Sequence, residues 1–98
     1  MTITKAAEAD KLELKVAGRL DTSTAPQLEK ELSESLTGVK ELVMDFQDLE
    51  YISSAGLRVL LSAQKIMNRQ GSMKVTGVNE IVMEIFEVTV FSDILTIA

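Results

Sequence analysis

The stretch Glu41-Leu-Val-Met-Asp-Phe-Gln-Asp-Leu-Glu-Tyr-Ile-Ser-Ser-Ala-Gly-Leu57 combines a short apolar strand with the start of a helix. The consecutive apolar residues Leu42 to Met44 indicate a strand that is covered on both faces, and therefore a central one. We predict a turn from Gln47 to Tyr51 and a helix over residues 55–69. A strand linked closely to a helix is typical of the crossover units of parallel sheets.

The predicted helix over residues 55–69 has two contrasting faces. Its wide apolar face comprises Leu57, Val59, Leu60, Leu61, Ala63, Ile66 and Met67. The opposite face carries, at helical spacing, Arg58, Ser62, Lys65 and Arg69. Gly71 is the expected end of this helix.

The residues before the opening stretch predict a hairpin and a helix. Residues 11–17 alternate between apolar and polar side chains, and residues 2–7 are a weaker strand candidate. Glu8-Ala9-Asp10 fits the turn between them. The helix that follows has the candidate N-cap Thr24, with Gln27 at the capping-box position. Its expected buried stripe consists of Ala25, Leu28, Leu32 and Leu36.

The residues after residue 69 predict one strand, one helix and an ambiguous tail. Met73 to Thr76 form the strand, and residues 79–87 form a helix. The apolar positions of that helix are Ile81, Val82, Ile85 and Phe86. Val88 to Ala98 fits either a helical turn at Ser92–Leu95 or an edge strand.

These elements together predict a single α/β domain over residues 1–98. Their order is β-β-α-β-α-β-α, which gives a mixed sheet of about four or five strands with helices packed on it.

The composition excludes several classes of function. The chain has 98 residues, no Cys and no His, which removes thiolate metal sites, Cys–His pairs and Ser-His-Asp triads. We therefore expect no enzyme and no cofactor. The net charge of −5 argues against nucleic-acid binding, because nucleic-acid binders usually carry a basic patch. No segment resembles a signal peptide or a membrane span, so we expect a cytoplasmic protein that does not insert into a membrane.

The segment Ser53-Ser54-Ala55-Gly56 is the first candidate site, because it lies where a strand ends and a helix begins. Free backbone N–H groups and the helix dipole at such a point would stabilise a phosphate. The small Ala55 and Gly56 would let a partner approach closely. A serine before a helix is also a common N-cap, which is the ordinary structural explanation.

Two further features have a functional and an ordinary explanation. Asp21 is either an acid that faces a partner or a helix-entry acid favoured by the helix dipole. The basic stripe Arg58, Lys65 and Arg69 either meets an acidic partner or is a solvated helix face.

Taken together, these segments resemble the STAS family, and specifically the small bacterial anti-sigma factor antagonists. The first matching segment is Val16-Ala-Gly-Arg-Leu-Asp21, followed by Thr24-Ala25 and a helix. The second and more specific one is Leu42-Val-Met-Asp-Phe46 with Leu49-Glu-Tyr-Ile-Ser-Ser-Ala-Gly-Leu57.

The resemblance implies a partner-switching mechanism. In that family the unphosphorylated protein binds an anti-sigma factor that is also a serine kinase, and this binding frees the sigma factor. The kinase phosphorylates a serine at the start of the second helix, which breaks the complex, and a PP2C-type phosphatase restores binding. The matching serine in this chain is Ser54.

The implied partner-binding residues surround that serine and the preceding loop. They are Asp21, Thr22, Ser23, Ser53, Ser54, Ala55, Gly56, Leu57 and Arg58.

The sequence departs from the family pattern at one position. Many members have Asp before the modified serine, whereas this chain has Ser53, which is a candidate second phosphate acceptor. The alternative function implied by the family is a constitutive, unphosphorylated STAS subunit of a lipid-transport or other protein assembly.

Overall fold

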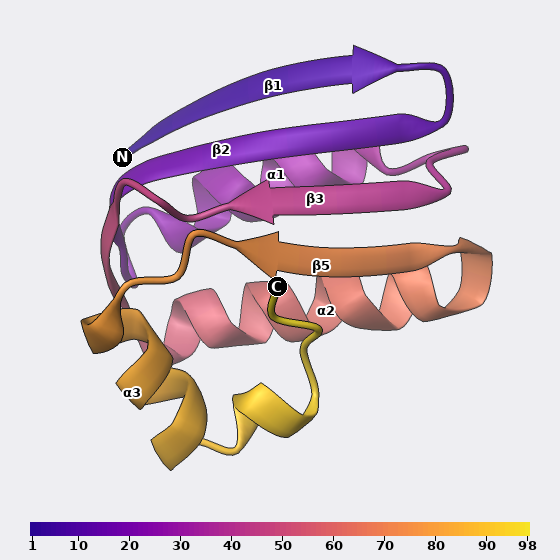
Figure 1. Cartoon of the computed structure of the whole chain (residues 1–98). Helices are drawn as coiled ribbons and strands as arrows, with labels where there is room; N and C mark the ends of the chain where they lie inside the picture. Colours follow the sequence, from indigo (N-terminus) through magenta and orange to yellow (C-terminus); the bar gives the residue numbers. More distant parts are fainter.

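The computed structural model describes all residues from Met1 to Ala98, and Figure 1 shows their arrangement. In chain order the elements are β1 (Thr2–Glu8), β2 (Lys11–Leu20), α1 (Ala25–Ser35), β3 (Glu41–Asp45), β4 (Leu49–Ile52), α2 (Ser54–Gln70), β5 (Ser72–Thr76), α3 (Glu80–Val88) and the 3-10 helix η1 (Phe91–Asp93). No helix is both long enough and apolar enough to cross a bilayer.

The five strands form a mixed sheet, as predicted. β1 is antiparallel to β2, and β2, β3 and β5 follow in parallel order. β2 is long enough to change neighbours: Lys11–Lys15 pair with β3, and Gly18–Leu20 pair with β4.

Strand β4 corrects the predicted turn from Gln47 to Tyr51. Its buried residues, Leu49 and Ile52, are three positions apart, which lacks the alternation that identifies a strand. β4 pairs only with the end of β2, a segment that is distant in the sequence. The observed order is therefore β-β-α-β-β-α-β-α.

The core lies between one face of the sheet and the helices. Figure 1 shows α1 and α2 on the same side of the sheet. The predicted buried stripe is confirmed. Its residues belong to one core cluster together with residues of the strands and of α2, and they are Ala25, Leu28, Leu32 and Leu36.

β3 is buried on both faces and lies in the centre of the sheet between β2 and β5, as predicted. Val43 is buried but is not part of the main core cluster. Its register partners are Glu13 of β2 and Lys74 of β5, whose long side chains flank it on the outer face. The burial of Val43 therefore requires no second layer of helices.

The predicted capping box of α1 is also wrong. Thr24 occupies the N-cap position but makes no side-chain cap bond. Its hydroxyl donates instead to the carbonyl of Arg19 at 2.8 Å and accepts from the N–H of Asp21 at 2.8 Å. Thr24 therefore holds the loop before the helix in place and does not cap the helix itself.

The structure corrects the predicted apolar faces of α2 and α3 and describes the tail. Ile66 of α2 and Ile81 of α3 are exposed, although both were assigned to the apolar faces of their helices, while Val82 and Phe86 are buried. The tail confirms the predicted helical turn, with a small shift to Phe91–Asp93, and has an isolated bridge in place of the predicted edge strand. It contains the helical turn η1, and Ile97 then forms a parallel bridge with Val75 at the edge of β5.

Candidate functional site

The carboxyl ends of β2 and β4 meet the N-terminus of α2. Leu20 and Ile52 are register partners at the ends of these parallel strands, and both are buried. The N–H of Ser53 donates to the carbonyl of Leu20 at 2.9 Å. The start of α2 is therefore fixed to the sheet by backbone pairing and by a hydrogen bond.

Gly56 allows α2 to rest directly on these strand ends. A Cβ atom at this position would lie 2.7 Å from Cγ of Leu20 and 2.8 Å from Cγ1 of Ile52. Such distances are too short for carbon atoms in contact. The small size of Gly56 thus serves packing within the chain, which corrects our expectation that it leaves room for a partner.

The predicted contact residues of α2 divide into two groups. Gly56 and Leu57 are buried and belong to the core side of the helix. Ser54 and Arg58 are exposed, one helical turn apart, and Ala55 is partly exposed between them. Only the second group presents side chains to the surface.

Ser53 and Ser54 differ sharply in accessibility. Ser53 is the N-cap residue in extended conformation, and its hydroxyl oxygen is buried without a hydrogen-bond partner. Ser54 is the first residue of α2 and is exposed. Ser54 is therefore not the N-cap that the sequence suggested, and its hydroxyl is the accessible one of the pair.

The N-terminus of α2 retains free hydrogen-bond donors. The backbone N–H groups of Ser54, Ala55 and Gly56 have no acceptor within the chain, and the side chain of Ser53 does not supply one. An exposed helix N-terminus with free N–H groups favours a nearby anion.

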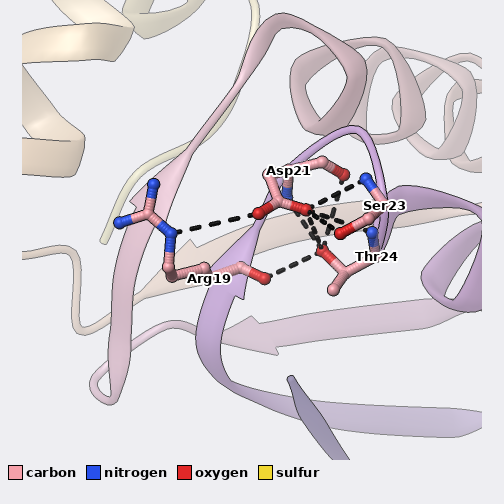
Figure 2. Close-up of polar contacts among 4 residues, drawn as sticks. All are labelled: Arg19, Asp21, Ser23 and Thr24. Atoms are coloured by element: carbon pink, nitrogen blue, oxygen red, sulfur yellow. Dashed lines mark hydrogen bonds and ion pairs between the residues drawn. The ribbon is translucent and has the colours of Figure 1, made fainter.

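Asp21 organises the loop between β2 and α1, as Figure 2 shows. Its Oδ1 accepts from the hydroxyl of Ser23 at 2.7 Å, from the N–H of Ser23 at 3.0 Å and from the N–H of Thr24 at 3.2 Å. Its Oδ2 lies 3.9 Å from Nε of Arg19. One carboxylate oxygen is thus committed to the loop, and the other faces the guanidinium group.

These contacts lower the pKa of Asp21 below its ordinary value. The largest cause is the hydrogen bond from the Ser23 hydroxyl. Desolvation opposes it, and the N–H groups of Ser23 and Thr24 with the Thr24 hydroxyl reinforce it. Asp21 is therefore a loop-positioning acid that stays ionised at neutral pH.

Arg19 and Tyr51 also lie at the site, although neither is among the predicted partner-binding residues. They are register partners on β2 and β4, and the guanidinium carbon of Arg19 lies 4.5 Å from the centre of the Tyr51 ring. This distance is typical of a cation–π contact. The pairing was not visible in the sequence because β4 itself was not predicted.

A groove of about 210 Å³ runs between α1 and α2 beside Ser54. The lining residues are Thr22, Ala25, Pro26, Glu29, Ala55, Arg58, Val59 and Ser62. The groove thus brings together the predicted loop residue Thr22 and the predicted helix residue Arg58. The groove also includes Pro26, Glu29 and Ser62, which were not predicted because they come together only when α1 packs against α2.

The basic stripe of α2 is exposed along its full length, as predicted. Arg58, Lys65 and Arg69 form no ion pair within the chain. These three cations are therefore available to an acidic group of another molecule or to a modification on α2.

Comparison with known proteins gives consistent matches over nearly the whole chain. The family model described as "Mlab, STAS domain" matches residues 3–96. The anti-sigma-B factor antagonist of Listeria monocytogenes is 33% identical over 97 residues, which cover 95% of this chain and 83% of that protein.

Solved structures share the fold. An anti-sigma factor antagonist from Mycobacterium paratuberculosis superposes with a TM-score of 0.88 at 20% identity, covering 98% of this chain and 83% of that one. The Bacillus protein SpoIIAA superposes at 14% identity with a TM-score of 0.77 in its unphosphorylated form and also 0.77 in its phosphorylated form. These two comparisons cover 99% of this chain, and 87% and 91% of the respective SpoIIAA chains.

Proposed function

Because the chain belongs to the STAS domain family, we propose that it is an anti-sigma factor antagonist whose partner binding is switched off by phosphorylation of Ser54. The unphosphorylated chain binds an anti-sigma factor that is a serine kinase, and this binding releases the sigma factor. A PP2C-type phosphatase reverses the modification.

The observation that carries this proposal is the exposure of Ser54 beside the buried hydroxyl of Ser53. A kinase transfers phosphate only to a hydroxyl that it can reach. Ser54 meets this condition at the surface of α2. Ser53 does not, so we no longer propose it as a second acceptor.

The surroundings of Ser54 suit a phosphate. The free N–H groups at the start of α2 are donors for its oxygens. Arg58 stands four residues further along the helix, the spacing at which a cation and an anion on one helix face interact. The free N–H groups and Arg58 would thus stabilise a phosphate on Ser54 in the unbound protein.

The same phosphate would disrupt a complex that covers the start of α2. It adds a charge of about −1.5 to −2 at pH 7. An unpaired charge in a docked interface costs roughly 2–5 kcal/mol, which corresponds to a loss of about 30- to several-thousand-fold in affinity. This effect is large enough to act as a switch.

No large conformational change is required by the proposal. The unphosphorylated and phosphorylated forms of SpoIIAA both share the fold of this chain. The start of α2 is also fixed by the hydrogen bond from Ser53 to Leu20 and by the packing of Gly56. In this proposal the switch acts through the charge of the phosphate at the start of α2.

The proposed contact surface consists of the accessible residues around Ser54. On α2 these are Ala55 and Arg58, and on the facing loop they are Thr22 and Ser23. Asp21 contributes by holding that loop in place, with its Oδ2 toward Arg19.

The test is phosphorylation of the purified chain by its cognate kinase with ATP, followed by intact mass measurement and peptide mapping. The proposal expects one phosphate on the wild type and on Ser53→Ala, and none on Ser54→Ala. Phosphate on Ser54→Ala at the wild-type rate, or none on the wild type, would contradict it.

A second arm separates the proposal from the alternative of a constitutive subunit. Ser54→Asp should weaken binding to the kinase, whereas Ser72→Asp, at an exposed serine just beyond the opposite end of α2, should have a much smaller effect. Unchanged binding of Ser54→Asp would favour the constitutive subunit.

A further inference from the structure

The most exposed apolar side chains of the molecule gather at its C-terminal end. Ile81 is 60% exposed and Val88 is 78% exposed on α3, and Val90 and Ile94 beyond it are 61% and 43% exposed. Only one other large apolar side chain, Ile66, is exposed to a comparable degree. Large apolar side chains that gather at one place on a surface mark an interaction site.

The backbone around Val90 holds this apolar group at the surface. Val90 has a φ of 58°, a conformation that β-branched residues rarely adopt. Its N–H donates to the carbonyl of Glu87, and its carbonyl accepts from the N–H of Asp93. Leu95 then enters the core, and residues 96–98 are bonded to Val75. The exposed side chains are thus presented by a segment that is anchored at both ends.

Acidic side chains lie beside the exposed apolar residues. Glu80, Glu84 and Glu87 on α3 and Asp93 in η1 are exposed, and none of them forms an ion pair within the chain. Residues 75–98 contain no Lys and no Arg. We call these four acids, together with Ile81, Val88, Val90 and Ile94, the α3 surface.

We propose that the α3 surface binds an amphipathic segment of a partner protein that carries Lys or Arg beside its apolar side chains. Apolar contacts would supply the driving force, and the acidic rim would select the basic partner. No residue of α3 lines the groove between α1 and α2. The proposed α3 surface is therefore distinct from the groove beside Ser54.

Charge decides between this occupant and two others. A symmetric contact between two copies would bring the acids of one α3 surface against those of the other, because a two-fold interface joins the same patch of each copy. An anionic lipid surface would repel the same acids. A basic protein segment is the occupant that both the apolar residues and the charges favour.

The test is site-specific photo-cross-linking of the full chain in cells of the bacterium that encodes it. Benzoylphenylalanine is placed at Val88, and the matched control position is Lys74, which is exposed on the outer face of the sheet. The cross-linked peptide is then sequenced by mass spectrometry. The proposal expects a partner segment with Lys or Arg next to apolar residues at Val88, and at most background yield at Lys74.

A synthetic peptide copied from that segment completes the test. Its affinity for the chain should fall about two- to twentyfold in the double variant Glu84→Lys, Glu87→Lys, and it should fall with added salt. Thermal melting confirms that the variant is folded. Ser54→Asp should leave this affinity unchanged, so the two sites are tested separately.

Four outcomes would overturn the proposal. They are equal yield at Val88 and Lys74, cross-links only to a second copy of the chain, cross-links only to lipid, and peptide affinity that is insensitive to the charge reversals.

Discussion

The backbone N–H of Ser53 donates a hydrogen bond of 2.9 Å to the carbonyl of Leu20, which joins the start of α2 to the end of β2. This bond fixes the orientation of the residues that follow. The side chain of Ser53 then points into the protein, and that of Ser54 points to the surface. The relationship explains how two adjacent serines acquire different chemical accessibility.

Substitution of Gly56 by Ala should destabilise the protein. The added methyl group would contact Leu20 and Ile52 at distances below 3 Å, and overpacking of this kind costs about 1–3 kcal/mol. Urea denaturation measures the change in the free energy of unfolding. The control Ser62→Ala, on the exposed face of the same helix, should stay within about 0.5 kcal/mol of wild type. Equal stability of Gly56→Ala and wild type would refute the close packing of α2 on the strands.

Substitution of Ser53 by Ala should leave stability unchanged or increase it. The hydroxyl of Ser53 is buried without a partner, and removal of such a group recovers its desolvation cost of about 1–3 kcal/mol in part. A serine that caps its helix behaves in the opposite way, since its replacement by Ala costs about 1 kcal/mol. A measured loss of that size would show that Ser53 caps α2 in solution.

The stabilising role of Asp21 should depend on pH in the acid range. Its folded-state pKa is lowered, chiefly by the Ser23 hydroxyl, so folding favours the ionised form. The resulting stability is present above the unfolded-state pKa of about 3.9 and is lost as the pH falls through the lower folded-state value.

The variant Asp21→Asn provides the matched measurement. The difference in unfolding free energy between wild type and Asp21→Asn should be constant near neutral pH and should shrink as the pH is lowered below about 4. A difference that does not change between pH 7 and pH 2.5 would show that the loop contacts do not favour the carboxylate.

Arg58 should interact with a phosphate on Ser54 across one helical turn. A nearby cation stabilises the dianionic phosphate and lowers its second pKa. In phosphorylated protein, Arg58→Gln should therefore raise that pKa, as followed by ³¹P NMR against pH. Lys65→Gln, seven residues further along the same exposed face, is the control and should change it less. Equal titration curves for wild type and Arg58→Gln would exclude the interaction.

The sequence allowed most of the fold to be predicted, because most elements carry a local periodic signal. Lys11 to Val16 of β2 alternate strictly, and the buried residues from Ala25 to Leu36 in and just after α1 repeat with helical spacing. β4 lacked such a signal and depends on pairing with the distant end of β2. The apolar run from Leu42 to Met44 correctly indicated a central strand, and the register partners of Val43 on the outer face are Glu13 and Lys74.

The candidate site was predictable in position but not in detail. Its place at a strand-to-helix junction follows from the order of elements, and Ser54 lies there. Which of the two serines is accessible depends on where α2 begins and on how it packs against the strand ends. The contact of Arg19 with Tyr51 and the groove between α1 and α2 depend on tertiary packing, which has no local sequence signature.

Calorimetric titration of the cognate anti-sigma factor kinase with the unphosphorylated chain and with the chain phosphorylated on Ser54 tests the central claim most directly. We expect the phosphorylated chain to bind at least about 30-fold more weakly, with unchanged secondary structure by circular dichroism. Equal affinity of the two forms would contradict the proposal that phosphate on Ser54 is the switch.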